Sequence, residues 1–187
     1  MHLAKMAEMA RVPYPDPDRL LPETQAALAQ LPALNIFAML AGGEGVLRAF
    51  TRLGNHLLFK SSLDPMLREL AILRVGALSG ASYEVHQHEA IARRLGMSEA
   101  LVVAVRGAPD DPAFDEMSRL VVRFTDDVVA NVRAGDDTFE PLRDRLTLQQ
   151  LEELTITIGY YMAVCRFLET FDVDVEDAES SGLSGNE

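Results

Sequence analysis

Two polar side chains lie on a helix face that should be apolar. Residues 80–96, GASYEVHQHEAIARRLG, have the periodicity of an amphipathic helix. At about 100° per residue, Glu84 and His88 lie about 40° apart, on the face that carries Ile91 and Ala92. A buried carboxylate or imidazole is destabilising unless it is hydrogen-bonded or paired. The sequence therefore predicts that Glu84 and His88 either have a polar partner inside the protein or line a pocket that contains water.

A second carboxylate comes from the preceding helix. Glu69 lies at the edge of the apolar arc of a helix that we expect to run from Asp64 to the turn at Ser79-Gly80. The tight turn should pack both helices as a hairpin and place Glu69 against His88. An imidazole between carboxylates has a coupled titration and can move a proton near neutral pH. Proton transfer is thus one interpretation, and a purely structural ion-pair network is the other.

Three further residues are candidates for binding a substrate beside this cluster. His56, in RLGNHLLF, lies beside the apolar face of its own helix. Arg74 interrupts an apolar arc, and its guanidinium suits a substrate carboxylate, although a structural ion pair is the more frequent role. Tyr83 points about 100° away from its neighbour Glu84, so we expect it to pack between helices.

The spacing E-x-H-x-H beginning at residue 84 looks like a set of metal ligands, but helix geometry argues against it. His86 points about 160° away from His88, so the three side chains cannot close on one ion, and we expect no metal. Cys165 is expected to be a small buried hydrophobe. Tyr160 and Tyr161 are expected to pack in the core or at an interface, with donation to a substrate oxygen as the alternative.

Helical signals recur along the whole chain, and no alternating strand pattern competes with them, so the expected fold class is all-α. Besides the hairpin, the expected helices are ETQAALAQL; the two halves of IFAMLAGGEGVLRAFTRLGNHLLFK, broken at Gly42-Gly43; a short helix from Ser98 to Gly107; a long helix opened by Asp111-Pro112 and closed by Ala134-Gly135; and a last helix to Phe171, headed by a capping box of Thr147 and Gln150.

The length, composition and charge of the chain limit the kinds of protein that it can be. With 187 residues, 48% of them hydrophobic, we expect an extended arm over residues 1–22, one helical domain over 23–175, and a disordered acidic tail over 176–187. The net charge of −12 does not support binding to nucleic acid or to an anionic membrane surface. The single cysteine suits a reducing compartment, and no apolar run reaches the roughly 18 residues of a membrane span, so we expect a cytoplasmic protein.

One long stretch resembles a known family. The run LDPMLRELAILRVGALSGASYEVHQHEAIARRLGMSEALVVAV is similar to the core signature of the carboxymuconolactone decarboxylase and alkyl hydroperoxidase D-like superfamily: an R-E pair, a Y-E-x-x-x-H helix ending in A-R-x-x-G, then a short helix. YYMAVCRFLETFDV resembles the closing helix of its longer members. The resemblance implies a helical bundle built round a helical hairpin. It also implies assembly into trimers or hexamers, with the pocket near a subunit interface.

The resemblance also implies which chemistry is missing. The hydroperoxidase branch uses a glutamate, a C-x-x-C pair and a histidine; on this pattern the glutamate falls on Glu69 and the histidine on His88. The two cysteines fall on Ala81 and Glu84. Peroxide reduction needs an attacking thiolate and a resolving thiol, so it would require Cys165 to act alone or an additional cofactor. The chain is similar instead to the cofactor-free decarboxylase branch, which works on a lactone acid from aromatic catabolism.

We therefore expect a cofactor-free acid–base enzyme that decarboxylates or isomerises a small organic acid or lactone; hydration would fit equally. His88 is the candidate proton donor to an enolate-like carbanion, Glu84 orients it or carries its own proton, and Glu69 sets the imidazole tautomer. The alternatives are a peroxidase-like activity and a non-catalytic oligomeric binding protein. The expected partners are a small-molecule substrate and further copies of the chain.

Overall fold

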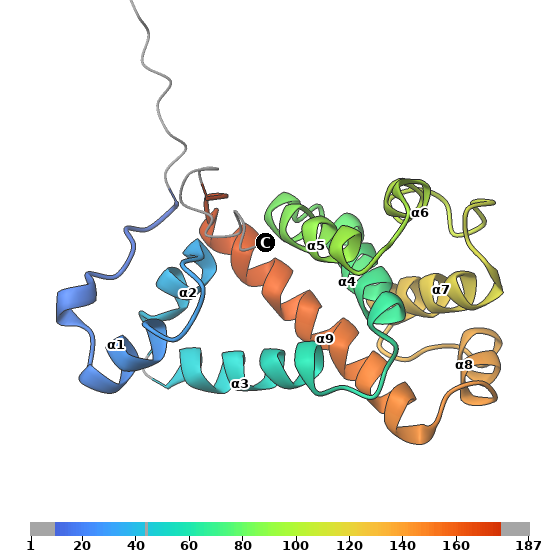
Figure 1. The fold of residues 1–187 in the computed structure, drawn as a ribbon, viewed down its shortest axis with the longest axis horizontal. Coiled ribbons are helices and arrows are strands. Elements are labelled where there is room, and N and C mark those ends of the chain that lie inside the picture. The colour runs from blue at the N-terminus through green and yellow to red at the C-terminus, as the bar shows by residue number, and fades with distance from the viewer. Residues whose placement is uncertain (1–9, 44, 177–187) are drawn as a thin grey trace, which may run out of the picture. The chain divides into compact units, whose positions relative to one another are not determined.

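The computed structural model describes residues 10–43 and 45–176. Within these ranges the chain forms nine α-helices and one short 3-10 helix and no strand, which confirms the all-α fold class (Figure 1). The chain divides into two compact units. One holds the described residues up to Leu53 together with those from Leu168 onward, and the other is Gly54–Phe167. None of the described helices is long and apolar enough to cross a membrane.

The first unit contains the proline-rich N-terminal segment. Its elements are η1 (Pro17–Arg19), α1 (Pro22–Leu28), α2 (Asn35–Leu40), the start of α3 (Val46–Phe59) and the end of α9 (Leu148–Phe171). The segment is tied to the other end of this unit, since Arg11 N donates to Phe171 O and the Tyr14 hydroxyl donates to Asp174. The prolines do not exclude every helix as we expected, because Asp16 caps a turn that begins with Pro17. The rest of the expected arm, residues 1–9, and of the acidic tail, residues 177–187, lie outside the described residues.

The second unit holds the hairpin. Its elements are the end of α3, α4 (Pro65–Ser79), α5 (Ser82–Arg94), α6 (Glu99–Ala104), α7 (Glu116–Ala130), α8 (Asp136–Arg143) and most of α9. Helix α4 packs against α5 and α7, and α7 packs against α8; α5 runs back alongside α4 in Figure 1. Because α4 is covered on several sides, every residue from Arg68 to Gly76 is buried. Charged side chains in this stretch therefore need partners inside the protein.

Local sequence signals define the hairpin. Asp64 caps α4 by accepting hydrogen bonds from two backbone N–H groups of its first turn. Gly80 ends the helix with φ of 67°, a left-handed conformation that glycine adopts without strain. At Gly76 an added Cβ would lie 2.9 Å from Val85 Cγ2, so the absence of a side chain allows α5 to lie directly against α4. The expected hairpin is confirmed, and so is the capping box at Thr147, whose Oγ1 accepts from the backbone N–H three residues later.

The long helix that we expected to open at Asp111 begins at Glu116 instead. Two of the aspartates that precede it, Asp111 and Asp115, have a side chain that accepts a hydrogen bond from a backbone N–H further along the chain. The carboxylate of Asp115 lies 2.7 Å from Ser118 N. Asp111 accepts a hydrogen bond from Ala113 N at 2.9 Å and forms a local turn. Asp115, which directly precedes the helical pattern of apolar residues, is therefore the cap.

The same helix ends at Ala130 rather than at residues 134–135. Asp127, in its last turn, holds the following loop: its carboxylate accepts from the side chains of Asn131 and Thr138, each at 2.7 Å, and from Gly135 N. The short helix α8, which we did not predict, starts directly after this loop. A side chain that accepts two hydrogen bonds from the loop and one from α8 thus replaces the glycine stop that we expected.

Candidate active site

The hairpin brings Glu69, Glu84 and His88 into one hydrogen-bonded cluster. Nδ1 of His88 lies 2.7 Å from Oε2 of Glu69, and Nε2 lies 2.9 Å from Oε1 of Glu84. The exposed fractions of Glu69, Glu84 and His88 are 0%, 4% and 6%. The expected apposition of Glu69 and His88 is confirmed, while the catalytic roles of the three residues stay predictions. Since both ring nitrogens have carboxylate partners, the imidazole is held in one orientation.

Arg68 extends the cluster and is the residue that sequence reasoning missed. Its Nε donates to Oε1 of Glu69 at 3.1 Å, so each oxygen of this carboxylate has a cationic partner. Adjacent helical residues point about 100° apart, so spacing alone gave no reason to join Arg68 and Glu69. The R-E pair of the family signature was the only sequence signal for this contact.

The charges of the cluster favour a protonated imidazole. Burial alone would lower the pKa of His88, but the negative charge of Glu84 and the hydrogen bonds to Glu69 and Glu84 outweigh it and raise the pKa to about 10. At neutral pH both ring nitrogens therefore donate, and the charges of His88 and Arg68 balance those of the two carboxylates. We expected the imidazole to exchange a proton near neutral pH. The pKa of His88 lies higher instead, because a carboxylate flanks the ring on each side.

Two tyrosines of α9 border the cluster. The ring of Tyr161 meets that of His88 edge to face, with centroids 4.9 Å apart and an interplanar angle of 85°. Tyr160 is next to it, at 5.3 Å between ring centroids. Burial, and then the negative charges of Glu84 and Glu69, raise the pKa of Tyr161 well above its usual value; burial and Glu84 raise that of Tyr160. Both hydroxyls therefore stay protonated across the physiological pH range. Tyr161 packs in the core as expected, and its core neighbour is His88.

Arg74 lies apart from the cluster, in a network of its own. Its Nε and Nη2 donate to the two oxygens of Asp126 at 2.5 and 2.8 Å. Its Nη1 donates to the carbonyl oxygens of Val105 and Gly107 at 2.9 and 2.6 Å. The guanidinium is thus fully used in joining α4 to α7 and to the end of α6, which is the structural alternative that we gave for it.

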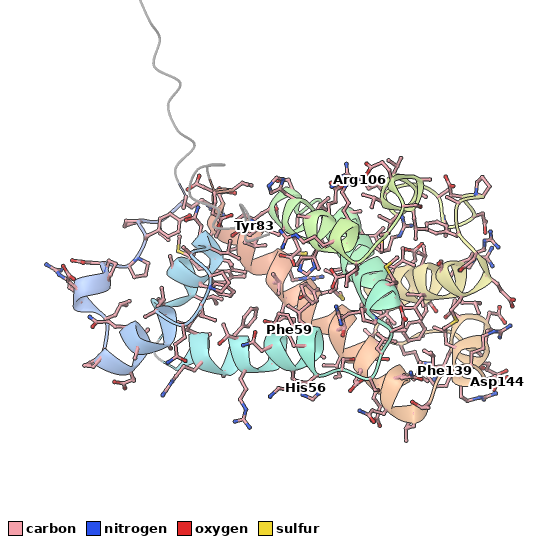
Figure 2. All side chains as sticks on the ribbon, in the orientation of Figure 1. His56, Phe59, Tyr83, Arg106, Phe139 and Asp144 are labelled. Carbon is pink, nitrogen blue, oxygen red and sulfur yellow. The ribbon has the colours of Figure 1, made fainter. Side chains whose placement is uncertain are left out.

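The other two substrate-binding candidates also lie outside the cluster. His56 has a half-exposed side chain, with Nε2 3.9 Å from Oε1 of Glu153. Tyr83 is buried on α5, as expected for a side chain that packs between helices. Figure 2 shows His56 on α3 well separated from Tyr83 on α5. His86 is exposed and Cys165 is fully buried. In the part of the chain that the structure describes, no group of three or more His, Cys, Asp or Glu side chains is placed to hold a metal ion.

One family model matches part of this chain. Residues 44–127 match the model of the carboxymuconolactone decarboxylase family. The matched stretch is somewhat less than half of the 187 residues, and it contains the whole α4–α5 hairpin. A search of curated proteins finds no match to this chain.

Solved structures of similar fold agree with the all-helical architecture. An uncharacterized peroxidase-related protein from Silicibacter sp. TM1040 has a TM-score of 0.80 and 20% identity, covering 97% of this chain and 98% of that one. The alkylhydroperoxidase AhpD core, an uncharacterized peroxidase-related protein from Ralstonia eutropha JMP134, has a TM-score of 0.79 and 20% identity over 91% and 94%. The debrominase Bmp8, in complex with 2,3,4-tribromopyrrole, has a TM-score of 0.68 and 17% identity over 82% of each chain. At these identities the likeness shows the fold alone, and the fold does not determine the reaction.

Proposed function

We propose that this chain is a member of the carboxymuconolactone decarboxylase family that catalyses cofactor-free proton transfer on a small organic acid or lactone, as a decarboxylation or an isomerisation. The observation that carries the proposal is a buried imidazole hydrogen-bonded to carboxylates on both sides, at 2.7 and 2.9 Å. Such a ring can pass a proton from one nitrogen while the opposite carboxylate stabilises its charge. A group with this geometry suits general acid–base catalysis.

Within the cluster, Glu84 is the group that would exchange a proton with the substrate. Both ring nitrogens of His88 are already hydrogen-bonded, so a substrate atom cannot reach one without displacing a carboxylate. Glu69 has each of its oxygens paired and is fully buried. Of the two roles that we gave Glu84 from the sequence, that of the group that carries the proton therefore has the stronger support.

A decarboxylation begins at the carboxylate of the substrate. The bond between the substrate carbon and its carboxylate breaks, carbon dioxide leaves, and the electron pair stays on the carbon as an enolate. Nε2 of His88 gives its proton to the carboxylate of Glu84, Glu84 passes the proton to that carbon, and solvent then reprotonates the imidazole. In an isomerisation, ionised Glu84 would remove a proton from one carbon and return it to another. In both reactions Glu69 and Arg68 hold the imidazole in place.

The thiol-dependent alternative has less support. On the hydroperoxidase pattern, the cysteine positions fall on Ala81 and Glu84, and neither side chain can attack a peroxide. Cys165 lies on α9 with no exposed surface. Two similar structures are of peroxidase-related proteins, but that reaction requires a thiolate and a resolving thiol. Acid–base chemistry uses only groups that the cluster contains.

Self-association is part of the proposal. In the unit Gly54–Phe167, large apolar side chains are exposed on α3 and α9: Phe59 is 78% exposed, Leu148 72% and Ile156 52%. Where such side chains form a contiguous patch, they are typical of a surface that another protein covers. We expect a trimer or hexamer by light scattering, and a monomer would contradict this part of the proposal.

A substrate panel tests the proposed reaction. The purified protein is incubated with carboxy-lactones and β-oxo acids, and loss of carbon dioxide or formation of an isomer is followed by NMR. We expect turnover of at least one compound, with loss of turnover in both His88→Ala and Glu84→Gln. His86→Ala, on the exposed side of the same helix, is the matched control and should keep full turnover. Turnover that survives both site substitutions would contradict the proposal.

A further inference from the structure

We infer that the hydroxyl of Thr157, on α9, donates a hydrogen bond to the substrate oxygen that carries the negative charge of the enolate. Thr157 would then be a second residue that contacts the substrate, beside Glu84. This role rests on the proposed function and deepens it, because it requires a substrate with a carbonyl oxygen next to the carbon that exchanges the proton.

The hydroxyl of Thr157 is buried without a partner. Thr157 has no exposed surface, and in the residues that the structure describes its Oγ1 makes no hydrogen bond. Three other threonines within helices, Thr51, Thr125 and Thr155, donate from Oγ1 to the carbonyl oxygen four residues earlier, at 2.7 or 2.8 Å. A helical threonine reaches that carbonyl in one of its two common rotamers, and Thr157 does not use it. Buried hydroxyls are normally paired, so Thr157 is an exception.

Thr157 lies on the face of α9 that is turned toward the hairpin. One turn earlier, Glu153 accepts a hydrogen bond from Ser62 N, just before α4 begins. One turn later, the ring of Tyr161 packs on that of His88. Residues four apart on a helix share a face, so Thr157 lies between these two contacts, about 6 Å along the helix axis from each. Its hydroxyl is therefore placed beside the proton-transfer cluster.

A neutral hydroxyl suits an oxygen that becomes negative during the reaction. Loss of carbon dioxide, or removal of a proton, leaves an enolate whose charge lies mainly on oxygen. A donor placed at that oxygen stabilises the transition state more than the ground state. Because the hydroxyl of Thr157 has no partner in the described chain, it breaks no internal hydrogen bond when it donates to the substrate. The carboxylates of Glu69 and Glu84 cannot supply this donor when they are ionised.

Binding at Thr157 must involve a rearrangement of side chains. Oγ1 of Thr157 is fully buried, and Glu84 is only 4% exposed, so a substrate that contacts both must displace side chains that cover them. Changes of side-chain rotamer are common when a protein binds a partner. Tetronic acid, whose anion is the enolate of a lactone, is small enough to require little displacement and is therefore the probe.

Stability and binding should change in opposite directions in Thr157→Val. Valine replaces an unpaired buried hydroxyl by a methyl group, so we expect a higher urea midpoint of unfolding. Calorimetry of the full-length protein at pH 7 should show tetronic acid binding at least about tenfold more weakly to Thr157→Val than to the unsubstituted protein. Thr157→Ser keeps the hydroxyl and should bind tetronic acid nearly as well as the unsubstituted protein.

Thr125→Val is the matched control. Thr125 is equally buried, in α7, and its hydroxyl donates to Val121 O. Removing a paired hydroxyl leaves that carbonyl oxygen without its donor, so we expect a lower urea midpoint and unchanged binding of tetronic acid. The two threonines should thus respond to the same substitution with opposite signs in stability, and only Thr157 should affect binding.

Four outcomes overturn the role of Thr157. They are no binding of tetronic acid to the unsubstituted protein at millimolar concentration, unchanged binding in Thr157→Val, an equal loss of binding in Thr157→Ser, and a lower urea midpoint in Thr157→Val. The last outcome includes failure to fold by circular dichroism, and it would show that the fold itself needs the hydroxyl. Failure of the proposed function looks different: Thr157-dependent binding of tetronic acid with no turnover across the substrate panel would contradict the proposed reaction and leave enolate binding in place.

Discussion

Two buried arginines on α4 show how differently one residue type is used within a single helix. Arg74 donates four hydrogen bonds, to both oxygens of Asp126 and to two carbonyl oxygens, and it joins neighbouring helices. Arg68, equally buried, donates one, to Glu69. A charged group whose donors are all paired stabilises the fold. The other donors of Arg68 have no partner among residues 10–43 and 45–176, so Arg68 joins fewer groups of the fold than Arg74 does.

The largest expected effect comes from removing the fully paired arginine. Arg74→Gln should lower the free energy of unfolding by about 4 kcal/mol, because it leaves Asp126 without its cation and two carbonyl oxygens without their donor. Arg68→Gln should cost about half as much, since Glu69 loses one of its two cationic partners but keeps its hydrogen bond to His88. Urea unfolding of both variants measures the difference. A larger loss of stability in Arg68→Gln than in Arg74→Gln would contradict this difference between the two arginines.

Removing the carboxylate next to Arg68 should have the next largest effect. Glu69→Gln leaves a buried guanidinium without its counter-charge, so we expect a loss of about 3 kcal/mol in the free energy of unfolding. It should also lower the pKa of His88 from about 10 toward its ordinary value, because one of the two groups that raise it becomes neutral. NMR titration of the His88 ring gives the pKa. A pKa that stays near 10 would show that Glu69 does not hold the imidazolium.

The raised pKa of His88 predicts a loss of stability in alkali. The folded-state pKa of about 10 lies above the ordinary value of 6.5, so the stabilisation is complete below pH 6.5 and is lost as the pH rises through 10. We expect the unsubstituted protein to exceed His88→Gln in the free energy of unfolding by about 2 kcal/mol at pH 6. That difference should shrink steadily toward pH 10. A difference that does not change with pH would indicate a neutral imidazole.

The smallest effect is expected at a carboxylate outside the cluster. Oε2 of Glu153 accepts hydrogen bonds from both hydroxyls and a backbone N–H of Ser61 and Ser62, at 2.7 to 2.8 Å. Burial opposes ionisation, but these bonds and that from Gln149 lower the pKa of Glu153 to about 2. The stability that this carboxylate contributes is present above pH 4.5 and is lost as the pH falls toward 2.

Glu153→Gln should therefore cost about 1 kcal/mol at pH 7, because the amide retains an acceptor oxygen, and it should leave turnover unchanged. Unfolding in urea at pH 7 and at pH 3 checks the first expectation, and the substrate panel checks the second. A loss of turnover as large as that of Glu84→Gln would mean that the catalytic cluster extends to the α3–α4 loop.

Sequence reasoning could locate the cluster because its signals are local. Glu84 and His88 are one turn apart on one helix, and Asp64 and Gly80 define the hairpin that brings Glu69 to them. It could not separate the roles of Arg68 and Arg74. Both interrupt a helix that is buried on several sides, so no exposed face distinguishes them, and partners such as Asp126 lie far along the chain.

The helix ends that we missed have a similar cause. Asp111 and Asp115 are both able to cap a helix, and the choice depends on which one the following apolar residues bring against the core. The end of α7 depends on Asp127, which binds a loop that follows it, and such a contact has no signal in helical periodicity.

Deuterium entry from solvent tests the central claim most directly. A γ-lactone acid that the protein turns over is incubated in deuterated buffer, and the label at its carbon atoms is measured by NMR for the unsubstituted protein, Glu84→Gln and His86→Ala. We predict deuterium at one carbon with the unsubstituted protein and with His86→Ala, and none above the uncatalysed background with Glu84→Gln. Equal labelling in all three would contradict proton transfer through the Glu69, His88 and Glu84 cluster.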